Sequence, residues 1–359
     1  MTRPTPQPLR IAQVAPVGTA VPPPLSGSIE TMTSVLTEGL VARGHHVTLF
    51  ATADSVTGAT LQATFPRGYR EDPTMWPWEL CELFNLSAAF ERAAAFDVIH
   101  CQSAYAPMSL AFGRLVTTPV LHTVHHSPTP DEVRQWQRYP EAAFVAVSHD
   151  QAARLAGLTL AGIVPHGLDP RRFAFRAQPD DYLLFLGRFT EGKGVVHAIE
   201  AARRVGIRLL LAAQENDYYR AVIAPLVDGE RIVYVGEVGH DAKVALLGGA
   251  RALLYPVQAG EPFGLVLTEA MACGTPVAAF AAGAVREVVD DGVTGGVFAS
   301  LDALVHGLPR VLALDRAVVR ATAVSRFGVE RMVEAYLDVY VELIARTRVV
   351  GQSESTGSK

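Results

Sequence analysis

Lysine is scarce in this sequence, because the 359 residues include only three lysines, Lys193, Lys243 and Lys359. The N-terminal half has none, and the whole chain carries a net charge of -5. Such a chain lacks the basic surface that displaces counterions from a nucleic acid, and it lacks a polybasic patch for an anionic membrane. We therefore expect neither a nucleic-acid partner nor strong membrane association.

Cysteines and long apolar runs are also few. Cys81, Cys101 and Cys273 are odd in number and lack the spacing of metal ligands, which argues against a disulfide framework and against a metal site. No window reaches the roughly 18 uninterrupted apolar residues that a membrane span needs. The apolar run near the N-terminus is short and ends at Pro16, so we predict a cytoplasmic protein.

Short apolar runs that alternate with stretches of helical periodicity predict the fold. This pattern is typical of parallel sheets with crossover helices, and it occurs in two successive series. The expected strands are residues 10–15, 46–51, 97–101, 120–124, 144–147 and 162–164 in the first series, and 182–186, 208–212, 231–235, 252–255 and 276–280 in the second. Because the length exceeds what one core usually serves, we predict an α/β protein of two doubly wound, Rossmann-like domains, residues 1–168 and 169–327.

The end of the chain has a different pattern. Residues 328–350 predict one long amphipathic helix that packs against the core, and residues 351–359 predict a disordered Gly/Ser-rich tail. The apolar positions with helical spacing are Met332, Tyr336, Val339, Tyr340, Leu343 and Ile344.

A glycine-rich turn follows the first expected strand of the second domain. The segment G-R-F-T-E-G-K-G, residues 187–194, opens a helix, and the free N–H groups of a helix start attract an anion. It nearly matches a P-loop, but Gly194 stands where a magnesium-binding Ser or Thr is required. Arg188 and Lys193 could clamp a diphosphate without metal. A helix start with exposed cations is the alternative interpretation.

Two glutamates, Glu261 and Glu269, lie eight positions apart around a second expected helix start near Gly264. Glu261 would precede the helix and Glu269 would lie within it, so the two carboxylates need not be adjacent. They suit hydrogen bonds to sugar hydroxyls beside a phosphate better than the close acid/base pair of a glycosidase. Two exposed charges are the alternative interpretation.

The setting of these glutamates is E-P-F-G-L-V…E-A-M-A-C-G-T-P-V, and G-R-x-x-x-x-K-G precedes it. With these motifs the sequence resembles the retaining family 4 glycosyltransferases of the GT-B fold. Weaker matches extend the resemblance over most of the chain, at residues 22–30, 43–48, 122–125, 147–148 and 164–169. The resemblance implies two facing Rossmann-like domains and a C-terminal helix that crosses back to the N-terminal domain.

By this resemblance the C-terminal domain binds a nucleoside diphosphate sugar, with UDP or GDP as the expected nucleotide and no further cofactor. Arg188 and Lys193 would contact the phosphates, Glu269 would hold the ribose hydroxyls, and Glu261 would lie beside the transferred sugar. The remaining expected donor-binding residues of this domain are Gly187, Phe263, Gly264 and Leu265.

The N-terminal domain would supply the acceptor site, for a small molecule, a glycan or a lipid-linked acceptor. Gly27 and Ser28 would lie near the diphosphate, and His125 would reach a hydroxyl of the donor sugar. Two residues depart from the family pattern. Ser28 replaces a second glycine of this loop, and His166 replaces a common asparagine, where we expect it to alter only a turn.

An aromatic-rich segment between residues 72 and 96 predicts either core packing, an acceptor pocket or a contact with a lipid-linked substrate.

The favoured function is metal-independent transfer of a sugar with retention of anomeric configuration. A sugar-nucleotide epimerase or a phosphorylase of the same fold is the alternative, and a nucleotide-sugar-binding protein without turnover is another.

Overall fold

The computed structural model describes residues 7–102, 106–258 and 260–356. Its N-terminal domain holds a seven-stranded parallel sheet in the order β3-β2-β1-β4-β5-β6-β7. The strands are β1 Arg10–Val14, β2 His46–Ala51, β3 Thr60–Ala63, β4 Val98–Cys101, β5 Val120–Thr123, β6 Ala143–Ala146 and β7 Thr159–Ile163. The α-helices are α1 Ser28–Ala42, α2 Trp78–Phe90, α3 Ala106–Gly113, α4 Pro130–Trp136 and α5 His149–Arg154.

The C-terminal domain holds a six-stranded parallel sheet in the order β10-β9-β8-β11-β12-β13. The strands are β8 Leu183–Leu186, β9 Leu209–Ala212, β10 Ile232–Gly236, β11 Leu253–Tyr255, β12 Val277–Phe280 and β13 Gly295–Phe298. The α-helices are α6 Val195–Val205, α7 His240–Gly249, α8 Leu265–Ala272, α9 Val285–Val288, α10 Leu301–Leu312 and α11 Arg316–Phe327. Short turns of other helix types are Ala93–Ala95, Pro170–Arg172, Glu191–Lys193, Tyr219–Ile223 and Ala224–Leu226.

Two doubly wound sheets confirm the predicted fold class, but each sheet has an edge strand that the sequence did not predict. β3 contacts one neighbour and is only partly buried, so its apolar signal is weak. β13 begins with Gly295 and Gly296, which are poor strand formers. An added Cβ on Gly295 would overlap the carbonyl oxygen of Val277 on β12, which explains why glycine stands there.

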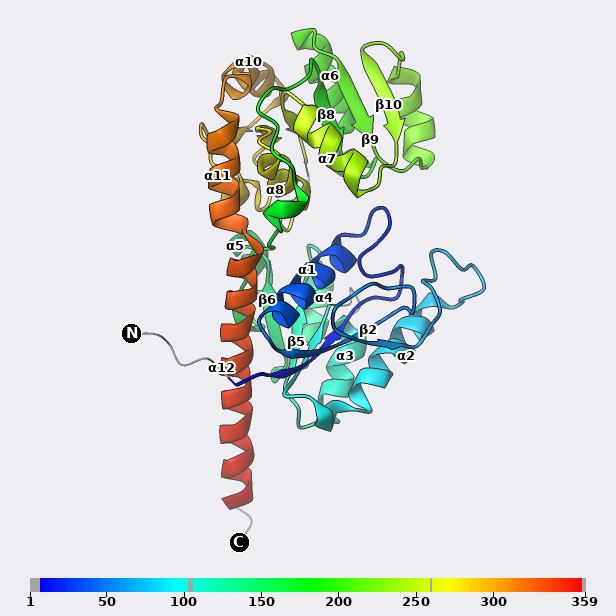
Figure 1. The fold of residues 1–359 in the computed structure, drawn as a ribbon, viewed down its shortest axis with the longest axis vertical. Coiled ribbons are helices and arrows are strands. Elements are labelled where there is room, and N and C mark those ends of the chain that lie inside the picture. Colours follow the sequence, from blue (N-terminus) through cyan, green and yellow to red (C-terminus); the bar gives the residue numbers. More distant parts are fainter. Residues whose placement is uncertain (1–6, 103–105, 259, 357–359) are drawn as a thin grey trace.

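The chain crosses between the domains twice, and the two crossings lie side by side. Leu168 forms a parallel bridge with Gly328, in which its N–H donates to the carbonyl of Phe327 and its carbonyl accepts from Val329. Helix α12, Val329–Thr356, then runs back along the N-terminal domain (Figure 1). It packs against α1 where Gly39 allows close approach to Val333. This return confirms the expected crossing helix.

The buried face of α12 includes the predicted apolar positions, with Met332, Tyr336, Val339, Tyr340 and Ile344 in the N-terminal core and Leu343 partly buried beside them. Val333, which was not predicted, is fully buried in the same core. The expected tail is corrected, because the helix continues through Gly351 to Thr356. A single glycine costs a helix only about 1 kcal/mol relative to alanine, and the polar residues after it are compatible with helix. Residues 357–359 lie outside the described part of the chain.

The aromatic-rich segment divides between core and surface. Leu86 and Phe90 of α2 are buried in the N-terminal core, whereas Trp76, Leu80 and Phe84 are exposed. Core packing therefore explains only part of this segment. No helix in the described part of the chain combines the length and the hydropathy that crossing a bilayer needs.

Candidate active site

The glycine-rich turn of residues 187–194 lies between β8 and α6, as predicted. Gly194 caps α6 with a left-handed backbone, φ +72°, and an added Cβ would overlap the carbonyl oxygen of Pro256. Gln258 donates its N–H to the carbonyl of Gly192 at 2.8 Å. Both contacts hold the turn against the chain that follows β11. This close approach explains the glycine at position 194, where a P-loop has a hydroxyl residue.

Lys193, Tyr255 and Glu261 form a compact, mostly buried group at this junction. The ammonium of Lys193 donates to Glu261 Oε2 at 2.5 Å and to the hydroxyl of Tyr255 at 3.1 Å. The hydroxyl of Tyr255 donates to the same carboxylate oxygen at 2.5 Å. Burial alone would raise the pKa of Glu261, but Lys193, Tyr255 and the N–H of Phe263 outweigh it and lower the pKa. Glu261 therefore keeps its negative charge inside the protein.

The backbone of Glu261 is held as firmly as its side chain. Its carbonyl accepts the N–H of Ala284 at 2.9 Å. Gly283 has φ +55°, and an added Cβ there would overlap the backbone of Glu261. The loop after β12 thus holds the backbone of Glu261 in place.

Glu269 lies within α8, which begins after Gly264, as the sequence predicted. Its Oε1 accepts from the ammonium of Lys243 on α7 at 2.5 Å, and both side chains are mostly buried. Gly264 has φ +89°, a conformation that favours glycine. The first N–H groups of an α-helix lack the usual partner four residues earlier in the helix. In α8 the N–H of Leu267 donates to the carbonyl of Gly264 at 3.0 Å, and the N–H groups of Leu265 and Val266 precede it.

The two internal lysines thus pair with the two motif glutamates, Lys193 with Glu261 and Lys243 with Glu269. Each lysine nitrogen is thus engaged as a hydrogen-bond donor to a carboxylate. This pairing disfavours the Schiff base that a pyridoxal-dependent phosphorylase would need from either lysine. Arg188, the other cation of the turn, is exposed. Burial and Glu261 raise the pKa of Tyr255 well above its ordinary value, and Arg188 is close enough to reduce this rise.

The N-terminal domain reaches this region through His125, which follows β5. Its ring stacks on His166 with centroids 5.2 Å apart, and His166 lies edge-to-face with Phe263 at 5.1 Å. His166 comes from the first crossing segment and is buried. Burial lowers the pKa of His166 to about 3, and the nearby Glu261 opposes this shift only in part. His166 therefore does more than alter a turn, because its ring lies between His125 of the N-terminal domain and Phe263 of the C-terminal domain.

Gly27 and Ser28 approach the C-terminal domain at a separate point. Gly27 caps α1, and the loop before it places the hydroxyl of Ser26 at 2.7 Å from Glu237 Oε1, beyond the end of β10. Ser28 is exposed. The segment that leads into α1 therefore contacts the β10 side of the domain, whereas His125 reaches the α8 side through His166.

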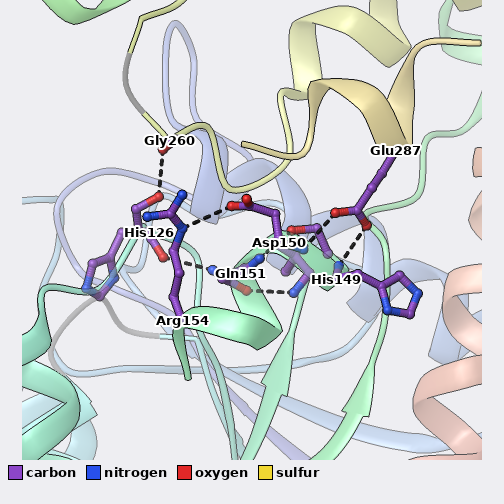
Figure 2. A network of polar contacts seen from close by, with 10 residues as sticks. His126, His149, Asp150, Gln151, Arg154, Gly260 and Glu287 are labelled. Atoms are coloured by element: carbon purple, nitrogen blue, oxygen red, sulfur yellow. Dashed lines mark hydrogen bonds and ion pairs between the residues drawn. The ribbon is translucent and has the colours of Figure 1, made fainter. Parts of the chain in front are cut away.

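A further set of contacts joins the two domains near Gly260 and Glu287 (Figure 2). The hydroxyl of Ser127 donates to the carbonyl of Gly260 at 2.7 Å, next to Glu261. The carboxylate of Glu287 accepts the N–H groups of His149 and Asp150, each at 2.7 Å. Figure 2 shows Glu287 pointing from the C-terminal domain to the start of α5. Residues on both sides of the interface thus fix the loop that carries Glu261.

The neighbouring histidines have other environments. On β5, His122 points to the face of the sheet opposite that of Thr123, and it contacts Phe144 and the hydroxyl of Ser109. His126 pairs with Glu132 at 3.0 Å. Within the described ranges, no group of three or more His, Cys, Asp or Glu side chains is arranged to hold a metal ion.

Sequence reasoning missed Tyr255 and the pairing of Lys243. Tyr255 ends a predicted strand at the edge where α/β proteins bind ligands, which could have identified it. Lys243 carried a signal in its rarity, because only three lysines occur in the chain. Nothing local to His166 indicated its contact with His125.

Comparisons with known proteins match both domains. Residues 29–172 match the family described as Glycosyltransferase Family 4, and residues 170–323 match Glycosyl transferases group 1. A phosphatidyl-myo-inositol mannosyltransferase of Mycobacterium tuberculosis is 28% identical over 358 residues, covering 90% of this chain and 93% of the relative.

Solved structures show the same architecture. AviGT4, a glycosyltransferase involved in avilamycin A biosynthesis, is 25% identical with a TM-score of 0.71, covering 94% of this chain and 98% of that one. Anabaena HepE, in complex with UDP and glucose, is 17% identical with a TM-score of 0.71, covering 93% and 100%. The second likeness concerns the fold alone.

Proposed function

Since this chain belongs to the family 4 glycosyltransferases of the GT-B fold, we propose that it transfers a sugar from a nucleoside diphosphate sugar to an acceptor hydroxyl, with retention and without a metal ion. The observation that carries this proposal is the pairing of Lys193 with Glu261 and of Lys243 with Glu269 on either side of the start of α8. Cations, the N–H groups at the start of α8 and carboxylates thus occur close together in the chain segments around this helix, and a sugar diphosphate needs partners of each kind.

The donor would insert between these charged groups. Its phosphates would bind Arg188, the N–H groups at the start of α8, and Lys193. The ammonium of Lys193 has three N–H groups, so it would donate to a phosphate oxygen as well as to Glu261. Glu269 would accept hydrogen bonds from the ribose hydroxyls, and Glu261 from the transferred sugar. Each preorganised donor aimed at the leaving diphosphate contributes roughly 3 kcal/mol of transition-state stabilisation in such a site.

In the proposed reaction the bond between the anomeric carbon and the diphosphate oxygen breaks, and its electron pair stays on that oxygen. The acceptor oxygen forms the new bond to the same carbon from the leaving-group face, which retains the configuration. Its proton passes to a departing phosphate oxygen, so no separate general base is needed. His125 would orient a donor-sugar hydroxyl from the N-terminal side.

The nucleotide of the donor can be identified by experiment. Thermal-shift measurements with UDP, GDP, ADP and dTDP sugars, including GDP-mannose because of the mannosyltransferase relative, would identify the nucleotide. A ligand that binds only the native state raises stability with its concentration. We expect one nucleotide series to stabilise the protein, with the same shift in the presence of a metal chelator.

Two variants test the site itself. Lys193→Ala and Glu269→Ala should each abolish the shift or weaken nucleotide affinity more than tenfold, because each removes a direct partner of the donor. Arg204→Ala is the matched control, since Arg204 pairs with Asp302 on the surface of the same domain. Unchanged binding in both site variants would reject the site, and a shift that requires a divalent metal would reject the metal-free mechanism.

A further inference from the structure

Six polar side chains are buried between the N-terminal sheet and the returning helix α12. This polar cluster consists of Gln13, His100, Gln102, Thr123, Tyr336 and Tyr340, each no more than 3% exposed. On the same face, two positions earlier in β1, β4 and β5, stand the apolar residues Ile11, Val98 and Leu121. The covered face therefore turns from apolar to polar toward the carboxyl ends of the strands, where the candidate active site lies.

Hydrogen bonds connect the cluster to α12. Gln13 Nε2 donates to the hydroxyl of Tyr340 at 2.9 Å, and this hydroxyl lies 2.7 Å from His100 Nδ1. Gln102 Nε2 donates to Gln13 Oε1 at 3.0 Å. On the far side, His100 Nε2 contacts the hydroxyl of Thr123 at 2.7 Å. The amide of Gln102 thus has one orientation in which its neighbours are satisfied, with its nitrogen toward the cluster.

The amide oxygen of Gln102 faces the other way, toward the active site. It lies 2.7 Å from His125 Nε2. Since an amide oxygen only accepts, Nε2 of His125 carries the hydrogen, and Nδ1 of the neutral ring is left as an acceptor. Burial, together with His166, His100 and His126, lowers the pKa of His125 well below its ordinary value, so the ring is neutral near pH 7.

We propose that Gln102 is a positioning residue that fixes the ring orientation and tautomer of His125. The hydroxyl of Tyr340 in turn fixes the amide of Gln102 through Gln13. The returning helix therefore contributes to the active site as well as to the core. This inference rests on the proposed function only in the role of His125, because the tautomer is a property of the free protein.

The physical reason lies in how a buried amide is held. Without the Tyr340 hydroxyl, the amide nitrogen of Gln13 keeps only its 3.4 Å contact with His100 Nδ1, and that of Gln102 keeps its 3.2 Å contact with the same atom. Both contacts are longer than the bond that is lost, so each amide can turn over more easily. Gln102 would then present its nitrogen to His125, which favours the tautomer with the hydrogen on Nδ1. A ring with the wrong tautomer offers a donor where the native ring offers an acceptor.

Imidazole nitrogen NMR of the free protein tests the inference directly. The His125 signals are identified by their loss in His125→Gln. In the native protein we expect a single neutral tautomer with the hydrogen on Nε2 between about pH 6 and 8. In Tyr340→Phe we expect the second tautomer to appear. Tyr182→Phe is the control, because it removes a tyrosine hydroxyl bonded to the carbonyl of Leu246 in the other domain.

A second variant keeps the inference testable if Tyr340→Phe does not fold. In Gln102→Glu a carboxylate faces His125 Nε2, and a nearby opposite charge should raise the pKa of His125 by at least about one pH unit. An unchanged His125 titration in Gln102→Glu would overturn the contact. A native His125 tautomer in a folded Tyr340→Phe would overturn the role of α12.

Turnover gives the functional readout, with the donor chosen by the thermal-shift screen. Tyr340→Phe should lower kcat about tenfold or more while the KM for the donor stays within about twofold, because misplacing a group at the reacting centre affects the transition state most. Native kcat together with an altered tautomer would overturn positioning. If no donor is found, the proposed function fails while the NMR result still decides the role of Gln102.

Discussion

At the scale of single residues, Glu261 shows how a buried carboxylate keeps its charge. Its pKa lies below the ordinary value of 4.5 because Lys193 and two hydrogen-bond donors outweigh the effect of burial. A group with a lowered folded-state pKa contributes stability that is complete above its unfolded pKa. This contribution is lost as the pH falls through the folded pKa.

Glu261→Gln should therefore destabilise the protein by an amount that is constant above about pH 5 and shrinks as the pH falls below about 4.5. The free energy of unfolding of both proteins, measured with denaturant at several pH values, checks this. Asp181→Asn is the control, since Asp181 pairs with Arg251 at the surface and should change stability by less than about 1 kcal/mol. A difference that grows toward acid would contradict the assigned charge of Glu261.

His166 illustrates a residue whose surroundings matter more than its place in a turn. Its ring contacts two others, His125 and Phe263, and such contacts contribute about 0.5 to 1.5 kcal/mol each beyond burial. His166→Asn should lower the free energy of unfolding by about 1 to 2 kcal/mol and also lower turnover, because the support of His125 is lost. His197→Asn, which removes a ring contact with Phe280 inside one domain, should leave turnover unchanged.

At the scale of an element, α6 offers two glycines with the same backbone and different surroundings. Gly194 before the helix has φ +72°, and Gly206 after it has φ +71°. An added Cβ on Gly194 overlaps Pro256, whereas one on Gly206 meets nothing within 4 Å. The difference between the two positions isolates the close approach of the glycine-rich turn to the chain after β11.

Gly206→Ala should cost about 1 kcal/mol, the ordinary penalty of a left-handed backbone. Gly194→Ala should cost at least about 2 kcal/mol more and should weaken nucleotide binding, because the turn must move away from Pro256 and take Lys193 with it. Denaturant unfolding and the nucleotide thermal shift measure both effects. Equal costs for the two substitutions would show that the approach to Pro256 does not constrain the turn.

At the scale of the whole molecule, several polar contacts join the two domains. Glu287 accepts two N–H groups at the start of α5 (Figure 2). The hydroxyl of Ser127 donates to the carbonyl of Gly260, next to Glu261. The bridge between Leu168 and Gly328 is where both crossings meet (Figure 1). These contacts couple the domain arrangement to the loop that carries Glu261.

Glu287→Ala should let the free protein sample more open arrangements, because two charge-assisted hydrogen bonds are lost. Small-angle X-ray scattering should show a larger radius of gyration, and nucleotide should reduce the difference if it bridges the domains. Glu330→Ala, which breaks a surface pair with Arg43, is the control and should leave the scattering unchanged. Identical scattering from Glu287→Ala and the native protein would show that this contact does not hold the domains.

The sequence by itself determined the two α/β domains, the glycine-rich turn, the helix start at Gly264 and the amphipathic helix near the end. Each of these depends on a period or a glycine position within a few residues, and such local patterns survive without knowledge of the fold. The edge strands β3 and β13 were missed because a partly exposed or glycine-containing strand carries little of that signal.

Only the tertiary structure decided which side chains meet. Lys243 and Glu269 lie on different helices, His125 reaches Phe263 through His166, and Gln102 is oriented from α12, more than 200 residues away in the chain. These contacts arise from strand order, from the packing of one domain on the other and from the return of the last helix. A single sequence carries no record of such long-range placement, because the same local pattern is compatible with many arrangements of its elements.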